Sequence, residues 1–318
     1  MSTAAPPRKD FLSILDFDPV ELERCLEIAA HVKSDRSLGR QAPTSGALEG
    51  RHVAMLFEKA SLRTRSTFEI AVVELGGNVV ALQTDAALGK REPVSDVARN
   101  LERWVDGIVI RTYSQKVLEE FAAAAPKLRV INALSDDQHP CQALADVMTL
   151  REQWNTVKGR TVAYVGDGNN VAVSLVHATL RLGINIHVAS PEGYALPEWA
   201  VQQAAVASRF GARLRLFTDA NDAVAGADAV YTDTWTSMGQ ESEAELRRQV
   251  FAPYQVNDAL MSQAKPGALF MHCLPAHRGE EVTTEVIESP ASVVFDQAEN
   301  RLHVQKALLS MLLSGSQS

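Results

Sequence analysis

The stretch VAMLFEKASLRTRSTFE, residues 53–69, passes from a short apolar run into a longer amphipathic segment. Five consecutive apolar residues at 53–57 are typical of a strand that is buried on both faces. Ser61, a preferred N-cap residue, precedes a segment whose pattern predicts a helix at residues 67–75. A strand that leads directly into a helix is the unit from which parallel sheets with crossover helices are built.

The same alternation recurs along the whole chain and predicts an α/β protein. We expect strands at residues 53–57, 79–82, 107–110 and 130–132 in the first half, and at 161–165, 185–189, 213–217, 229–232 and 268–271 in the second. Helices are expected at residues 21–32, 67–75, 94–105, 115–124, 142–153, 172–182, 197–210 and 304–313.

The length of 318 residues predicts two domains, since one domain takes about 150 residues. We expect the first domain at residues 1–150, with a C-terminal helix of about 302–318 returning to it, and the second at 151–301. Each would be a parallel sheet flanked by helices, with the active site in the cleft between them.

Composition and charge exclude several classes of protein function. The net charge of -8 argues against a general binder of nucleic acid or of anionic membranes, because such binders need a basic surface. Three cysteines, Cys25, Cys141 and Cys273, are too few and too far apart for a disulfide framework or a metal cluster. No apolar stretch approaches the roughly 20 residues that span a bilayer. We therefore expect a cytoplasmic protein.

The turn at residues 58–65 has the composition of an anion site. A helix capped by Ser61 leaves the amides of residues 62–64 pointing outward from its positive end. Arg63 and Arg65 add charged donors. Taken alone, such a segment favours an ordinary capped helix with surface arginines.

Polar residues also follow two other strands of the first half. Arg111 comes directly after residues 107–110, and His139 and Gln142 lie where the helix after residues 130–138 begins. Singly, Arg111 could be an ion-pair partner and His139 a structural histidine. Because the carboxyl ends of parallel strands share one sheet edge, their convergence favours a site for a phosphate-bearing ligand.

The motifs SLRTR at 61–65 and HPCQ at 139–142 resemble the carbamoyltransferases, and the resemblance covers nearly the whole chain. It implies that Thr64, Arg111 and His139 polarise the carbonyl oxygen of carbamoyl phosphate, where charge accumulates during attack. Two positions depart from the common pattern: Leu62 replaces a frequent threonine, and Ala87 a frequent glutamine that reaches a neighbouring subunit's donor. The implied donor-binding residues here are Ser61, Leu62, Arg63, Thr64, Arg65, Arg111, His139 and Gln142.

The segment DTWTSMG at 233–239 resembles the acceptor motif of ornithine carbamoyltransferases. The resemblance implies that Asp233 pairs with the α-ammonium of L-ornithine, whereas Ser237, the amide of Met238 and Asn170 hold its carboxylate. A polar loop with a tight turn at Gly239 is the alternative for these residues.

The motif HCLPAHRG at 272–279 is the most specific in the chain. The resemblance places the thiol of Cys273 and the carbonyl of Leu274 beside the reacting groups, and Arg301 on the donor. An isolated cysteine is usually a buried, inert one. We assign Cys273 a role in orienting the amine, with no covalent acyl intermediate, because a positioned uncharged amine already meets the needs of the substitution.

Other function classes fit less well. The segment VGDGNNV at 165–171 resembles a dinucleotide-binding turn, but it lacks the third glycine and the acidic residue after the next strand. Intact Arg63, His139, Asp233 and Cys273 argue against a non-catalytic homologue. Acceptors such as aspartate, putrescine or an N-acylated ornithine do not match the 237–239 motif.

The resemblance therefore implies an ornithine carbamoyltransferase without metal or organic cofactor. It also implies a homotrimer or an assembly of trimers, with no nucleic-acid or membrane partner. The sequence leaves open whether the enzyme works in arginine synthesis or in the catabolic direction.

Overall fold

The computed structural model describes residues 10–58, 61–83, 92–237 and 239–314. The chain divides into two compact units, the first Met1–Cys141 with Arg301–Ser318, and the second Gln142–Asn300. Both divisions fall inside helices, α6 (Pro140–Gln153) and α13 (Val294–Leu313). Ala87 and Met238, which the sequence singled out, lie outside the described residues.

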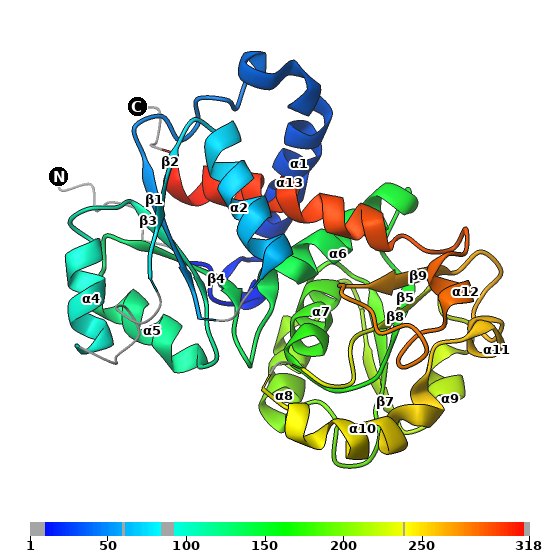
Figure 1. Ribbon diagram of the computed structural model, residues 1–318. Coiled ribbons are helices and arrows are strands. Elements are labelled where there is room, and N and C mark those ends of the chain that lie inside the picture. The colour runs from blue at the N-terminus through cyan, green and yellow to red at the C-terminus, as the bar shows by residue number, and fades with distance from the viewer. Residues whose placement is uncertain (1–9, 59–60, 84–91, 238, 315–318) are drawn as a thin grey trace. The chain divides into compact units, whose positions relative to one another are not determined.

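The first unit is built on a four-stranded parallel sheet in the order β2-β1-β3-β4. Its apolar side chains pack with those of α4 and α5 on one face, and Figure 1 shows α1, α2 and α13 on the other. The strands are β1 (His52–Phe57), β2 (Asn78–Ala81), β3 (Gly107–Arg111) and β4 (Arg129–Leu134). The helices are α1 (Pro19–Ser34), α2 (Leu62–Glu74), α4 (Val94–Leu101) and α5 (Gln115–Ala124), with short 3₁₀ segments at Ile14–Asp16 and Asp35–Gln41.

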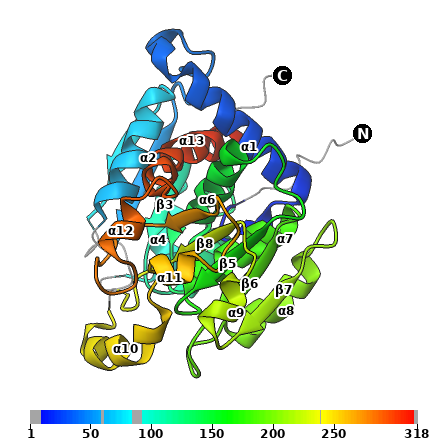
Figure 2. The same ribbon diagram turned by 90° about the vertical axis from the view of Figure 1, so that its right-hand side faces the viewer.

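The second unit is built on a five-stranded parallel sheet in the order β7-β6-β5-β8-β9, and β8, β5, β6 and β7 can be followed across it in Figure 2. The strands are β5 (Thr161–Val165), β6 (Asn185–Ala189), β7 (Leu214–Phe217), β8 (Ala229–Thr232) and β9 (Leu269–His272). Helices α7 (Asn170–Arg181) and α8 (Glu198–Ala207) share one apolar core with the sheet. The short helices α9 (Ala220–Val224), α11 (Asp258–Met261) and α12 (Thr284–Ile287) share the other.

The strand order of the second unit reverses between β5 and β8. In open α/β sheets, ligands bind outside the carboxyl ends of the strands at such a reversal. The loop after β8 is followed by a 3₁₀ turn at Glu241–Glu243, by α10 (Ala244–Phe251) and by a second 3₁₀ turn at Ala252–Tyr254.

The predicted α/β class and the predicted strands are confirmed, with strand ends that differ by at most two residues. The C-terminal helix is the main difference, because it begins at Val294 and not at residue 304. Its added first half carries buried polar residues such as Gln297 and Asn300, which interrupt the apolar pattern of a helix. The short helices α9 to α12 were not predicted, since so few residues show no helical period.

Among the helices of the described residues, none combines the length and the apolar character that crossing a membrane requires.

Candidate active site

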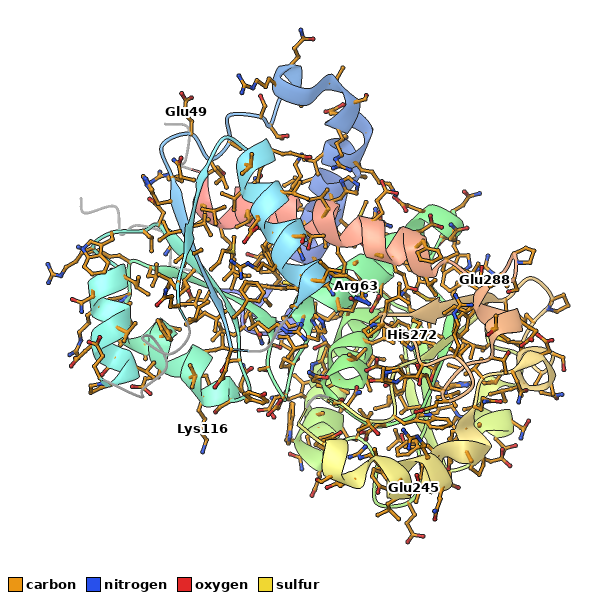
Figure 3. All side chains as sticks on the ribbon, in the orientation of Figure 1. Glu49, Arg63, Lys116, Glu245, His272 and Glu288 are labelled. Atoms are coloured by element: carbon orange, nitrogen blue, oxygen red, sulfur yellow. The ribbon has the colours of Figure 1, made fainter. Side chains whose placement is uncertain are left out.

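The first turn of α2 has the geometry of an anion site. Ser61 is the N-cap, as predicted, and its hydroxyl oxygen accepts a hydrogen bond from the amide of Thr64 at 3.3 Å. Leu62 is 79% exposed, so its side chain packs against little and the position offers mainly its backbone amide. Arg63 lies in this turn at the N-terminal end of α2 (Figure 3), and Arg65 pairs with Glu69 at 2.8 Å.

Two buried arginines converge on the hydroxyl of Thr64. Arg111, the last residue of β3, donates to it at 3.4 Å, and Arg301, from α13, donates at 2.8 Å. Arg111 is 8% exposed, Arg301 is 3% exposed and Thr64 is 1% exposed. Guanidinium groups form charge-assisted hydrogen bonds with oxyanions, so two of them beside one hydroxyl make a suitable place for an anionic ligand.

His139 belongs to the same cationic group. Burial lowers the pKa of its imidazole well below the usual value, and the charges of Arg301 and Arg111 lower it further. The imidazole is therefore neutral near pH 7, with one nitrogen that donates and one that accepts. The structure thus brings together Thr64, Arg111, His139 and Arg301, three of them from strand ends or helix starts at one sheet edge.

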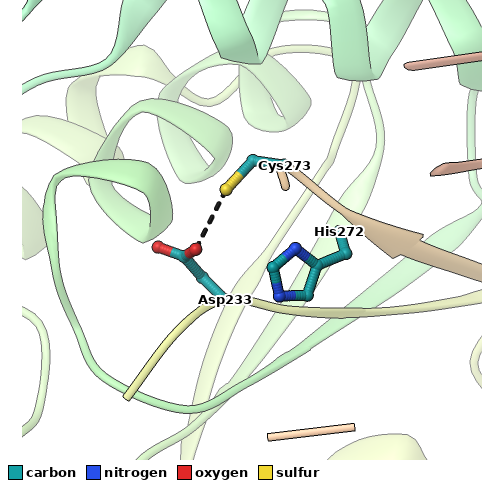
Figure 4. Close-up of side chains that lie close together, drawn as sticks. All are labelled: Asp233, His272 and Cys273. Atoms are coloured by element: carbon teal, nitrogen blue, oxygen red, sulfur yellow. Dashed lines mark hydrogen bonds between the residues drawn. The ribbon is translucent and has the colours of Figure 1, made fainter. Parts of the chain in front are cut away.

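A second polar cluster lies at the carboxyl ends of β8 and β9. These strands pair in parallel with Thr232 opposite His272, so the next residues, Asp233 and Cys273, emerge side by side. The thiol of Cys273 donates to Oδ1 of Asp233 at 2.9 Å (Figure 4). Asp233 is 6% exposed, and its other oxygen, Oδ2, accepts from Nδ2 of Asn169 at 2.9 Å.

The Asp233 contact bears on the chemistry of Cys273. The nucleophilic form of cysteine is the thiolate, and its negative charge would be repelled by a carboxylate at this distance. The geometry therefore favours a thiol that donates a hydrogen bond over a thiolate that attacks a carbonyl carbon.

The backbone of Leu274 is held by a buried pair behind it. Leu274 has φ of 56°, in the left-handed region, and its amide donates to Nδ1 of His272 at 2.8 Å. Because Nδ1 accepts, Nε2 carries the proton and donates to Glu281 at 3.2 Å. These contacts fix the direction of the chain that leaves β9.

Asp233, His272 and Cys273 present ligand atoms within 4.8 Å of one another, which makes them a candidate metal cluster. The carboxylate and the thiol are bonded to each other, and both ring nitrogens of His272 are engaged with Leu274 and Glu281. Each of the three groups is therefore already hydrogen-bonded to other groups of the protein.

The remaining predicted residues lie elsewhere in the second unit. Asn170 opens α7, and Ser237 lies in the loop after β8, where its amide donates to Oε1 of Gln240 at 3.1 Å. Gln142 is buried in α6, and its side-chain amide donates to Asp146 at 2.8 Å.

Sequence reasoning missed two residues of this region. Asn169 was considered only as part of a dinucleotide-like turn, yet it bonds to Asp233. Arg247 of α10 donates to Asp167 at 2.8 Å and to the carbonyl of Trp235 at 2.9 Å, which anchors the loop after β8. The sequence carries no local signal for either contact. Asn169 and Asp233 are 64 residues apart, and Arg247 and Asp167 are 80 residues apart.

Comparisons with known proteins cover nearly the whole chain. Residues 9–152 match the family described as aspartate/ornithine carbamoyltransferase, carbamoyl-P binding domain, and residues 158–312 match the Asp/Orn binding domain of the same family. An ornithine carbamoyltransferase of Pyrococcus abyssi is 50% identical over 312 residues, which are 96% of each chain. One of Pyrococcus furiosus that is described as anabolic is also 50% identical, over 96% of this chain and 97% of its own.

The chain is also similar to solved structures of ornithine carbamoyltransferases. The ornithine carbamoyltransferase structure from Pyrococcus furiosus has a TM-score of 0.91 at 47% identity, and the match covers 98% of this chain and 99% of that one. The structure from Thermus thermophilus has a TM-score of 0.85 at 43% identity, with 98% and 100% covered.

Proposed function

The chain belongs to the aspartate/ornithine carbamoyltransferase family, and from that premise we propose how its residues divide the work of the reaction. Its function is the transfer of the carbamoyl group of carbamoyl phosphate to the δ-amine of L-ornithine, which gives L-citrulline and phosphate. The convergence of two buried arginines on Thr64, with the neutral His139 within reach of both of their charges, is the observation that carries the residue assignment.

The donor is held by the first unit's cationic group. The phosphate is bound by the amides and side chains at the start of α2, from Ser61 to Arg65, together with Arg301. The carbonyl oxygen accepts hydrogen bonds from Thr64, Arg111 and His139. The neutral imidazole of His139 donates one of them. We assign Gln142, Cys273 and Leu274 to the carbamoyl group through the family resemblance.

The acceptor is held by the second unit's acidic cluster. Asp233, held by two hydrogen bonds, pairs with the α-ammonium of ornithine, and Cys273 orients the amine that reacts. The α-carboxylate is bound by Asn170, Ser237 and the amide of Met238. This set needs an acceptor that carries both an ammonium and a carboxylate, which favours an α-amino acid with a free amino group.

Transfer proceeds by direct attack of the uncharged δ-amine on the carbonyl carbon. A tetrahedral intermediate forms with its negative charge on the oxygen that faces Thr64, Arg111 and His139. The bond from carbon to the phosphate oxygen then breaks, phosphate leaves with the electron pair, and the extra proton of the nitrogen passes to the departing phosphate. Positioned donors and a positioned amine supply the catalysis, without a covalent enzyme intermediate.

Acceptor choice tests the function directly. With saturating carbamoyl phosphate, we expect kcat/KM for ornithine to exceed that for N-acetylornithine, putrescine and aspartate by about 10³-fold or more. N-acetylornithine has no α-ammonium for Asp233, putrescine has no α-carboxylate, and aspartate has no δ-amine to attack the donor. Colorimetric detection of the carbamoylated product measures all four. Equal or higher activity with one of the analogues would reassign the acceptor.

The pH profile tests which group must ionise. Because the pKa of His139 is lowered, its imidazole stays neutral from about pH 6.5 upward and adds no ionisation there. The δ-amine has a pKa near that of lysine, about 10.4, so its reactive fraction grows about tenfold per pH unit below that value. We expect kcat/KM for ornithine to rise steadily between pH 6 and 8, and a flat profile would contradict direct attack by the free amine.

Several broader properties follow as proposals from the family. We assign residues 1–150 and 302–318 to the carbamoyl phosphate domain and residues 151–301 to the ornithine domain. A homotrimer or an assembly of trimers in the cytoplasm is the expected form. One 50% identical relative is described as anabolic, which supports work in the direction of citrulline formation for arginine biosynthesis.

A further inference from the structure

Asn169 lies at the turn between β5 and α7 and is the N-cap of α7. Its Oδ1 accepts from the amides of Val171 at 3.0 Å and Ala172 at 3.2 Å, and from the hydroxyl of Tyr164 at 3.4 Å. Since only the carbonyl oxygen of the amide accepts, these donors fix the orientation of the side chain. Nδ2 is therefore directed at Asp233, to which it donates at 2.9 Å.

The turn that carries Asn169 is held firmly. A Cβ at Gly168 would meet backbone atoms of Ala195 and Leu196 at 2.4 Å, so the chain at 168 packs directly against that segment. The amide of Gly168 also donates to the carbonyl of Tyr194 at 2.8 Å. Asn169 thus reaches Asp233 from a fixed backbone.

Capping alone does not explain asparagine at this position. Serine and aspartate cap helices about as well, because a cap needs only an oxygen that accepts. Asparagine is the cap residue that also carries an NH₂ group, and here that group donates to a carboxylate. The residue type therefore matches a double task, to cap α7 and to hold Asp233.

We propose that Asn169 is a positioning residue for the acceptor, which sets the orientation of the Asp233 carboxylate and, through it, of the Cys273 thiol. A carboxylate turns easily about its Cβ–Cγ bond, because that torsion is broad. With Asn169 on Oδ2 and Cys273 on Oδ1, both oxygens have a fixed donor and their remaining lone pairs have fixed directions. This inference rests on the proposed role of Asp233 in binding the ornithine ammonium.

Two substitutions separate positioning from capping. Asn169→Ser keeps an oxygen for α7 and removes the NH₂ donor, whereas Asn169→Asp keeps the cap and places a second carboxylate against Asp233. Asn257→Ser is the matched control, because Asn257 caps α11 in the same unit through Oδ1 and the amide of Leu260 at 3.0 Å.

For Asn169→Ser we expect KM for ornithine to rise about tenfold, since one hydrogen bond to a charged group is lost. The KM for carbamoyl phosphate and the thermal midpoint should stay at the values of the unchanged protein. For Asn169→Asp we expect a loss of about 100-fold or more in kcat/KM for ornithine at pH 8.

Steady-state kinetics against each substrate from pH 6 to 9, with thermal unfolding of each variant, decide the outcome. A KM for ornithine within twofold of the original in Asn169→Ser overturns the proposal. An equal rise of both KM values with a lower thermal midpoint overturns it too, because it marks a structural role only. Failure of the unchanged protein to make citrulline would instead overturn the proposed function.

Discussion

Replacement of Arg111 by methionine should lower kcat/KM for carbamoyl phosphate by about 10²- to 10³-fold, the usual loss when one preorganised donor to a developing oxyanion is removed. Arg111 is 8% exposed and shares the Thr64 hydroxyl with Arg301. The substitution removes one of the two buried guanidinium charges of the donor site, in a place where water screens little. Methionine replaces the apolar stem of arginine with an unbranched apolar side chain and carries neither the charge nor the donors.

The thermal midpoint of Arg111→Met should stay close to that of the unchanged protein, because the substitution also removes repulsion between Arg111 and Arg301. Arg99→Met is the control, since Arg99 lies on α4 of the same unit and pairs at 3.4 Å with Asp96 on the exposed surface. Its kinetic constants should not change. A kcat/KM for Arg111→Met within tenfold of the original would remove Arg111 from the donor site.

Replacement of Asp233 by asparagine should raise KM for ornithine by about 10²- to 10³-fold and leave the dissociation constant of carbamoyl phosphate unchanged. Asparagine has the same shape but no charge, so the α-ammonium loses its counter-ion in a place that is 6% exposed. In the original protein, the NH₂ group of Asn169 and the thiol of Cys273 both donate to Asp233. The new NH₂ group of asparagine would face one of these two donors in place of an accepting oxygen.

Asp219→Asn is the control for this change, because Asp219 follows β7 of the same sheet and caps α9 from the surface. Asparagine also caps helices, so activity and stability should be retained. Steady-state kinetics for ornithine and isothermal calorimetry with carbamoyl phosphate measure both expectations. A loss of carbamoyl phosphate binding in Asp233→Asn would show that the binding of the two substrates is not separable in the way that we assign it.

Much of the site follows from local pattern. Ser61 could be predicted as an N-cap because capping depends on one residue and on the helix directly after it, and its hydroxyl accepts from Thr64. Arg111 and Asp233 could be placed at strand ends, because parallel strands in α/β proteins end at a common edge.

Other parts depend on partners that are distant in sequence. The first half of α13 was missed because its buried polar residues find partners on α6, as when Gln297 donates to Asp146 at 2.9 Å. A buried helix whose polar side chains are bonded to other helices lacks the apolar stripe by which sequence patterns identify helices.

The sequence by itself determined the alternation of strands and helices, the polar residues that follow them and the family that they indicate. Only the tertiary structure decided the strand order β7-β6-β5-β8-β9, which places β8 between β5 and β9. That order brings Asp233 to Asn169, 64 residues away, and to Cys273, 40 residues away. Because the same local periods fit several strand orders, the choice among them depends on packing between distant segments, and so does the acceptor cluster that this order builds.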